Sequence, residues 1–248
     1  MRRDLSRRGF LGAAGTAVAA GAVAGVSAAQ AAEKPNGGKL RIVGVCCSPR
    51  RGKTTAAAMQ ACLDAAKAAS PGVEVEMIEL AGLKIPGEVA AGVPLGPGEK
   101  DDFPAVAAKI GAPDVAGIII GTPVYFGNMS SLCKAFLDRC IVFRKNEFAL
   151  RNKVAGVLAV GGARNGGQEL AVQSVLAAML CQEMIAVGDG RPTAHVGATL
   201  VNNGKDDISA DDFGLSTAKN LGRRVVEVAM RIRQGGRGGN SSGDDSGG

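Results

Sequence analysis

The sequence predicts an α/β domain with an open, five-stranded parallel sheet and helices on both faces. Short apolar runs rich in β-branched residues alternate with longer segments whose apolar residues recur at helical spacing. Parallel neighbours in a sheet need crossover connections, and these are right-handed, which places helices on both faces. The 46% hydrophobic and 21% charged residues are typical of a globular protein with a well-buried core.

The first part of the domain is expected to contain two strands with a helix between them. Residues 40–46 form a short apolar run that predicts a buried strand, and the Ala-rich residues 54–69 predict a helix. Residues 73–80 alternate apolar side chains with glutamates, which indicates an edge strand with one partly exposed face. Residues 81–98 are rich in Gly and Pro and predict a loop.

The second part is expected to contain the central strands. Residues 115–121 form a continuous apolar run, typical of a central parallel strand. Residues 154–160 predict a fourth strand, and residues 185–187 a brief fifth strand. The remaining expected helices cover residues 101–110, 130–139, 168–184 and 216–233.

The start of the chain has the features of an export signal. A basic start, a weakly apolar Ala/Gly/Val run and a small-x-small ending at Ala31 predict cleavage after that residue. Arg7 and Arg8 precede Phe-Leu and resemble the bacterial twin-arginine class, which implies a periplasmic or otherwise exported protein. A membrane anchor is the disfavoured alternative because the run is poorly hydrophobic, so no stable membrane insertion is expected after cleavage. The expected organisation is a signal peptide (1–31), a linker (32–38), the folded domain (39–233) and a disordered Gly/Ser/Asp tail (234–248).

The charge distribution argues against a nucleic-acid partner. The formal net charge is +6, but residues 1–31 contain four Arg and one Asp and so account for half of it. The other basic residues are scattered among acidic ones, and one Tyr and no Trp are available for stacking bases.

The cysteines resemble neither a disulfide framework nor a metal site. No Cys-x-x-Cys occurs, so structural zinc and a compact iron–sulfur cluster both lack their usual ligands. Most lie in apolar patterns, where a cysteine is usually a small buried hydrophobe. The six are Cys46, Cys47, Cys62, Cys133, Cys140 and Cys181.

The first candidate ligand-binding loop lies between a strand and a helix, at residues 48–55, and reads Ser-Pro-Arg-Arg-Gly-Lys-Thr-Thr. Free backbone N–H groups and the helix dipole favour an anion there, hydroxyl groups can donate to it, and Arg50 or Lys53 can balance its charge. A capped helix start is the plainer interpretation. A nucleotide P-loop is disfavoured because Cys47 stands where that motif has its leading Gly.

The second loop carries a specific resemblance. Residues 123–139 are similar to the Pro-Val-Tyr-x-Gly-x-x-Ser-x-x-x-Lys-x-Phe-x-Asp-Arg pattern of the flavodoxin-like NADPH-dependent FMN reductases and the related iron–sulfur flavoproteins, and every fixed position is present. Tyr125, Phe126 and Gly127 can offer apolar contact and backbone amides to a flavin ring, and Asn128 can reach a polar atom of it. The Lys134 and Asp138 pair is expected to be an ordinary exposed i, i+4 pair.

The third loop, residues 161–169, resembles the Gly-Gly-x-Arg-x-Gly-Gly-Gln-Glu segment of the same family. The resemblance covers roughly residues 40–233 and implies a flavodoxin-like sheet of order 2-1-3-4-5 with bound FMN. Two departures stand out: Lys53 replaces the usual Asn of the first loop, and residues 81–114 lack the cysteines of the iron–sulfur members. The expected FMN-binding residues are Ser48, Arg50, Gly52, Lys53, Thr54, Thr55, Pro123, Val124, Tyr125, Phe126, Gly127, Asn128, Gly161, Gly162, Arg164, Gly166 and Gly167.

The implied chemistry is electron transfer through FMN, with no catalytic side chain and no metal ligand assigned. NAD(P)H is the electron donor that the family implies, with a quinone, free flavin or protein as acceptor. The alternatives are an exported electron carrier that exchanges electrons with a partner protein, and an empty binding module. His195 is expected to be structural because it has no visible partner. The family also implies a homo-oligomer, a dimer or tetramer, to which the 81–98 loop could contribute.

Overall fold

A parallel sheet forms the middle layer of the domain, and the computed structural model describes it within residues 40–238. The strand order is β2-β1-β3-β4-β5, with a further strand, β6, paired with β4, and all named pairings are parallel. The predicted fold class and strand order are confirmed. The strands are β1 (Leu40–Cys46), β2 (Val73–Glu79), β3 (Val115–Pro123), β4 (Val154–Gly161), β5 (Ile185–Ala186) and β6 (Ala198–Val201).

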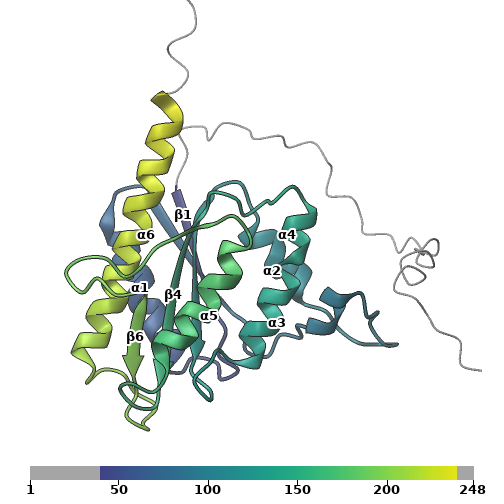
Figure 1. Cartoon of the computed structure of the whole chain (residues 1–248), viewed down its shortest axis with the longest axis horizontal. Coiled ribbons are helices and arrows are strands. Elements are labelled where there is room, and N and C mark those ends of the chain that lie inside the picture. Colours follow the sequence, from purple (N-terminus) through teal and green to yellow (C-terminus); the bar gives the residue numbers. More distant parts are fainter. Residues whose placement is uncertain (1–39, 239–248) are drawn as a thin grey trace, which may run out of the picture. The chain divides into compact units, whose positions relative to one another are not determined.

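Helices cover both faces of the sheet, as Figure 1 shows. Helices α1 and α6 pack on one face, where Leu63 and Leu221 share a hydrophobic cluster with Ile42 of the sheet. The other helices pack on the opposite face, around Phe103 and Phe136. The helices are α1 (Thr54–Ala69), η1 (Gly87–Ala91), α2 (Phe103–Ile110), α3 (Ser131–Arg139), α4 (Ile141–Lys145), α5 (Gln168–Leu180) and α6 (Asp212–Gly238).

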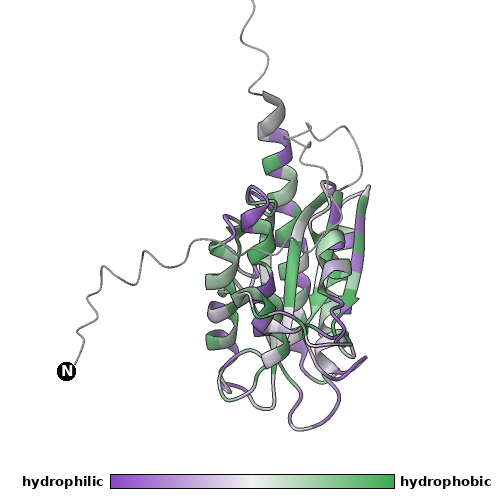
Figure 2. Ribbon diagram, turned by 90° about the vertical axis from the view of Figure 1, so that its right-hand side faces the viewer, coloured by the Kyte–Doolittle hydropathy of each residue, from purple (hydrophilic) through white to green (hydrophobic). Residues whose placement is uncertain are grey.

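The burial of the strands follows their sequence patterns. Strand β4 is buried along its whole length, as expected for a continuous apolar run between two helical layers. Figure 2 shows strongly hydrophobic strands in the interior and hydrophilic stretches on the outer helices and loops. At the edge, Glu76 of β2 accepts hydrogen bonds from Arg41 and Lys109, each at 2.8 Å. The alternating pattern therefore correctly predicted β2 as an edge strand.

The fifth strand is split, which the sequence analysis missed. β5 pairs with the start of β4 and β6 pairs with its end. Between them the chain makes an excursion, residues 187–197, away from the sheet. The buried Asp189 holds its two sides together, because it accepts hydrogen bonds from the backbone N–H of His195 and the hydroxyl of Thr193. A side chain at Gly188 would lie 2.1 Å from the carbonyl oxygen of His195, so the two sides of the excursion are in close contact.

Helices α5 and α6 differ most from their predicted bounds, and the short helices η1 and α4 were not predicted. Helix α5 ends at Leu180 rather than at 184, because the chain turns at Glu183, whose φ is +56°. Helix α6 begins at Asp212 instead of 216 and continues to Gly238, so residues 234–238, which were expected to belong to the disordered tail, are helical. None of the helices within 40–238 is long and apolar enough to span a membrane. The expected signal peptide, the linker and residues 239–248 of the expected tail lie outside the described residues.

Candidate functional site

The first loop joins β1 to α1 at the carboxyl edge of the sheet, where α/β domains bind ligands. The Ser48 hydroxyl accepts a hydrogen bond from the backbone N–H of Arg50 at 3.1 Å, which makes a tight turn. Glu79 accepts from the backbone N–H of Gly52 at 2.8 Å. Helix α1 then begins at Thr54, and its N-cap, Lys53, makes no side-chain capping bond. The first turn therefore keeps backbone donors available for an anion.

The threonines of this first turn are less accessible than expected. Both Thr54 and Thr55 are buried, and the Thr55 methyl group lies 3.4 Å from where a Cβ at Gly121 would stand. Both threonines stand in the first turn of α1, whose N-cap makes no side-chain bond. A hydroxyl at this position can donate to a ligand that reaches the first turn.

Two cations of the first loop, Arg50 and Lys53, have a partner that the sequence did not indicate. Arg50 Nη1 lies 2.7 Å from Oδ1 of Asp206, and Lys53 Nζ lies 3.3 Å from Oδ2 of the same carboxylate. Asp206 belongs to the loop between β6 and α6. This fourth segment thus joins the three predicted loops at the same edge.

The second loop forms a tight turn that exposes an aromatic side chain. Tyr125 and Asn128 exchange backbone hydrogen bonds of 2.9 and 3.1 Å, and Phe126 and Gly127 between them have φ of +50° and +72°. Two positive φ values are those of a type I′ turn, which is unusual for a bulky residue such as Phe. Phe126 is fully exposed, and a Cβ at Gly127 would meet open space. The turn therefore presents an aromatic face and bare backbone outward.

The second loop is tied to both of its neighbours. The Ser130 hydroxyl donates to the carbonyl oxygen of Cys47 at 2.7 Å and accepts from the backbone N–H of Cys133 at 3.1 Å. On the other side, a Cβ at Gly167 would lie 2.7 Å from the Cα of Gly127. The loops after β1, β3 and β4 are therefore assembled into one surface.

The third loop is organised by Gln168, the first residue of α5. This buried side chain donates to the carbonyl oxygen of Ala163 at 2.7 Å and accepts from the backbone N–H of Gly166 at 2.8 Å. A Cβ at Gly161 would lie 2.5 Å from its amide nitrogen, so a larger residue at the end of β4 would displace the Gln168 amide from these bonds. The glycines give the loop its turn, and Gln168 holds that turn in place.

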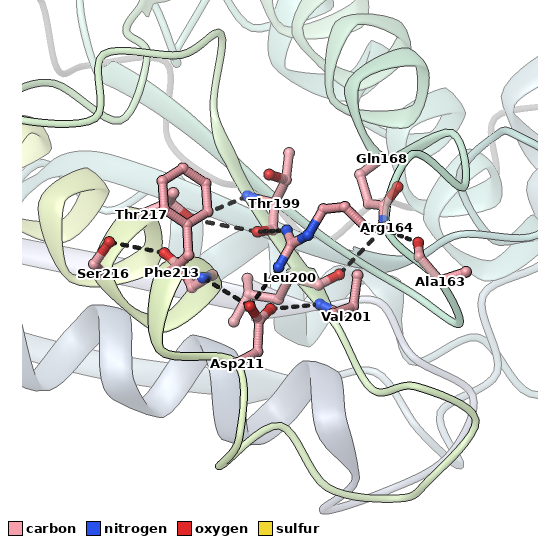
Figure 3. Close-up of polar contacts among 11 residues, drawn as sticks. Ala163, Arg164, Gln168, Thr199, Leu200, Val201, Asp211, Phe213, Ser216 and Thr217 are labelled. Atoms are coloured by element: carbon pink, nitrogen blue, oxygen red, sulfur yellow. Dashed lines mark hydrogen bonds and ion pairs between the residues drawn. The ribbon is translucent and has the colours of Figure 1, made fainter.

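Arg164 of the third loop is engaged with the start of α6, as Figure 3 shows. Its guanidinium pairs with the buried Asp211 and donates to the carbonyl oxygen of Thr199 at 3.3 Å. It also lies over the ring of Phe213, 5.7 Å from the centroid. Asp211 in turn accepts from the backbone N–H of Val201 at 2.7 Å. Arg164 thus links the third loop to β6 and α6.

The exposed pair expected of Lys134 and Asp138 is present, whereas His195, which was expected to lack a partner, has one. Lys134 and Asp138 form an exposed ion pair of 2.6 Å along α3. The ring of His195 lies 3.5 Å from the Asp189 carboxylate and contacts Phe213 edge-on, with ring centroids 5.8 Å apart. His195 therefore takes part in closing the excursion between β5 and β6.

Five of the six cysteines are buried, and Cys181 is exposed. Burial raises the pKa of the Cys47 thiol well above its ordinary value, and the neighbouring Cys133 thiol adds to the effect. No group of His, Cys, Asp or Glu suited to hold a metal ion occurs within residues 40–238. Cys47, Cys133 and Cys140 belong to the hydrophobic cluster on one face of the sheet, and Cys62 belongs to the cluster on the other face.

Comparison with known proteins identifies the family. Residues 40–198 match the NADPH-dependent FMN reductase family. The chain belongs to this family. An iron–sulfur flavoprotein of Methanocaldococcus jannaschii is 39% identical over 198 residues, covering 79% of this chain and 100% of the relative. An NAD(P)H dehydrogenase (quinone) of Paracoccus denitrificans is 34% identical over 155 residues, covering 56% of this chain and 73% of the relative.

Solved structures agree with the fold of this FMN reductase family member. A WrbA-like flavodoxin from Agrobacterium tumefaciens superposes with a TM-score of 0.54 at 18% identity, covering 78% of this chain and 98% of the other. RosB superposes with a TM-score of 0.60 at 14% identity, covering 84% and 90%. The family assignment makes the chain a flavin-dependent oxidoreductase with FMN as its cofactor.

The residues present suit FMN. The uncapped start of α1, with the hydroxyls of Thr54 and Thr55, offers donors to a phosphate. The outward Phe126 and the bare backbone at Gly127 offer contact to a flat, largely apolar ring. The supporting residues Gln168 and Ser130 were part of the quoted motifs but were not assigned a role, whereas Asp206 stands in no motif.

Proposed function

We propose that this oxidoreductase is an NAD(P)H-dependent FMN or quinone reductase. Membership of the FMN reductase family and the related NAD(P)H dehydrogenase (quinone) support this reaction class. The observation that carries the proposal is the joining of three loops at one sheet edge, by Ser130 to Cys47 on one side and by Gly167 against Gly127 on the other. Such an edge can hold a phosphate at one end and a planar ring at the other.

In this proposal the first loop binds the FMN phosphate and the other loops bind the ring. Arg50 and Lys53 balance the phosphate charge, and the start of α1 donates backbone N–H groups to it. Bound FMN supplies the electron-accepting ring, while the protein orients it and excludes water from it. The ring-binding residues are Pro123, Val124, Tyr125, Phe126, Gly127, Asn128, Gly161, Gly162, Gly166 and Gly167; Arg164 holds the third loop, and Ser48, Gly52, Thr54 and Thr55 complete the phosphate loop.

Retained flavin tests the binding site. The chain from Ala32 onward is saturated with FMN and desalted, and its absorption spectrum is compared with that of the Arg50→Gln variant. The matched control is Arg151→Gln, which removes an exposed cation paired with Glu183 at 2.9 Å. Near-stoichiometric flavin in the parent and control, with loss in Arg50→Gln, supports the site. Equal retention of flavin by all three proteins would show that the phosphate does not bind at Arg50.

The electron donor is tested separately. Anaerobic addition of NADH or NADPH to the flavin-loaded protein is expected to bleach the flavin absorption bands, and steady-state oxidation with a quinone or FMN identifies the acceptor. An exported electron carrier is the second candidate, because the twin-arginine-like start at Arg7 and Arg8 supports a location away from the cytoplasmic nicotinamide pool. A protein that retains FMN but is not reduced by either nucleotide favours the carrier.

We also propose export and self-association. Secretion of a fusion that is lost when Arg7 and Arg8 are both replaced by Lys supports the twin-arginine route.

A dimer or tetramer is supported by the exposed Val93 and Leu95 of the 81–98 loop and by the outward Phe126. Light scattering measures the mass directly, and a monomer at all concentrations contradicts self-association.

A further inference from the structure

Asp206 holds two of the three cations of the first loop, Arg50 and Lys53, while the third, Arg51, donates to the carbonyl oxygen of Ala81. Its two carboxylate oxygens lie 2.7 Å from Arg50 Nη1 and 3.3 Å from Lys53 Nζ. The three side chains are about half exposed, at 50%, 47% and 45% for Arg50, Lys53 and Asp206. One carboxylate therefore occupies the two positive groups that are proposed to receive the FMN phosphate.

The loop that carries Asp206 is anchored at its two ends. At the start, the backbone N–H of Asn202 donates to the carbonyl oxygen of Gly161 at 3.0 Å. At the end, Asp211 is buried and bound to the backbone of Val201. Within the part of the chain that the structure describes, Arg50 and Lys53 are the groups that hold the Asp206 side chain. Asp206 can therefore leave the cations without unfolding the ends of its loop.

A phosphate monoester and a carboxylate compete for binding to these cations. The phosphate carries nearly two negative charges at neutral pH and three strong acceptor oxygens, whereas the carboxylate carries one charge and two oxygens. Both anions bound together would set about three negative charges against the two positive charges of Arg50 and Lys53. Like charges at such distances repel, so one anion displaces the other.

We propose that Asp206 is a specificity-determining residue that competes with the FMN phosphate for Arg50 and Lys53. It lowers the contribution of the phosphate to flavin affinity and promotes release of FMN, while leaving the contacts of the flavin ring unchanged. Lys53, which stands where the family pattern has Asn, provides the second cation for this exchange. This inference rests on the proposed FMN site and adds that the bound flavin is exchangeable.

Two flavins and two variants test the competition in the full chain. FMN carries the phosphate and riboflavin lacks it, so the ring contacts are common to both ligands. The test variant is Asp206→Asn. The control is Asp207→Asn, which removes the same charge from the next residue, whose carboxylate accepts from the backbone N–H of Ser209 at 2.8 Å.

Titrations that follow quenching of flavin fluorescence are expected to show about three- to tenfold tighter FMN binding in Asp206→Asn, the range for loss of exposed ion pairs. Riboflavin affinity stays unchanged in Asp206→Asn, and both affinities stay unchanged in Asp207→Asn. Stopped-flow displacement is expected to show slower FMN release from Asp206→Asn. Hydrogen exchange of residues 202–209 is expected to accelerate when FMN binds to the parent, since Asp206 then leaves its partners.

Three results would overturn the proposal. Weaker FMN binding in Asp206→Asn would show that the carboxylate positions the cations instead of competing for them. Equal tightening in both variants would show a general charge effect. Riboflavin tightening in parallel with FMN would show a change in the ring site. Absence of both FMN and riboflavin binding in the parent would instead refute the proposed function itself, so the two failures are distinguishable.

Discussion

The hydroxyl of Ser130 donates a hydrogen bond of 2.7 Å to the carbonyl oxygen of Cys47, across a separation of 83 residues. The same hydroxyl accepts from the backbone N–H of Cys133 and so caps helix α3. One buried oxygen atom thereby joins the end of β1 to the loop after β3. The relative position of the first two loops depends on this contact.

Replacement of Ser130 by Ala is expected to lower the free energy of unfolding by about 1–3 kcal/mol, since it removes a helix cap and leaves a buried carbonyl without its donor. FMN binding weakens as well, because the two loops lose their common support. Denaturant unfolding and FMN titration measure the two effects. Ser130→Thr retains both bonds and is expected to behave as the parent, whereas Ser131→Ala, at an exposed neighbour, changes neither quantity.

Gly167→Ala tests the contact between the second and third loops. Gly167 has a φ of +99°, and the added Cβ would lie 2.7 Å from the Cα of Gly127. FMN binding is expected to weaken by about tenfold, the equivalent of losing one or two contacts. The control is Gly72→Ala, which has a φ of +83° but open space around it, before β2. Equal loss of flavin in both variants would show that backbone strain alone is responsible.

Asp211→Ala is expected to lower the free energy of unfolding by about 3 kcal/mol, because it removes a buried carboxylate that pairs with Arg164 and accepts from the backbone of Val201. Thermal or chemical unfolding measures the loss. Asp212→Ala, in the exposed first turn of α6, is the control and changes stability by less than about 1 kcal/mol. A small effect of Asp211→Ala would mean that the loops rearrange to satisfy these groups.

The packing of α1 against α6 requires a glycine at 222. A Cβ there would lie 2.1 Å from the carbonyl oxygen of Cys62. Gly222→Ala is therefore expected to destabilise the protein by about 1–3 kcal/mol. Gly235→Ala lies in the same helix with no atom near its Cβ, and is expected to be neutral or to stabilise by up to about 1 kcal/mol. Urea unfolding of the two variants gives opposite signs if the packing controls the effect.

Because the Cys62 thiol is buried, we expect the free energy of unfolding to fall at alkaline pH. Burial raises its pKa from 9.0 to about 12, so the unfolded chain loses this proton at lower pH than the folded protein. The contribution is fully present below pH 9 and is lost as the pH rises toward 12. Between pH 8 and pH 10, the free energy of unfolding of the parent is expected to fall by about 1 kcal/mol more than that of Cys62→Ala. Parallel pH profiles would contradict this assignment.

Much of this fold follows from local patterns in the sequence. The continuous apolar run at 115–121 and the alternation at 73–80 correctly placed β3 in the middle of the sheet and β2 at its edge. The split fifth strand was missed because its halves are only two and four residues long. Hydrophobic periodicity cannot distinguish such short runs from the loop between them.

The parts of the candidate site that lie within one short segment were predictable from the sequence, whereas the contacts between distant segments were not. The motifs predicted the three loops, and their turns follow from glycines and from the local Gln168 contacts. The pairing of Arg50 with Asp206 spans 156 residues, and that of Arg164 with Asp211 spans 47. Each arises from tertiary placement of the segment after β6, a strand that the sequence pattern did not indicate.

The divided strand beside β4 also affects how copies of this protein can meet. The edge there consists of the two-residue β5 and the buried, four-residue β6 with an excursion between them, so an incoming strand finds no continuous ladder of hydrogen-bonding groups. At the opposite edge, β2 carries glutamates that resist addition of a strand. Both ends of the sheet are thus unfavourable for edge-to-edge addition of a strand, which favours assembly through the loops and helices.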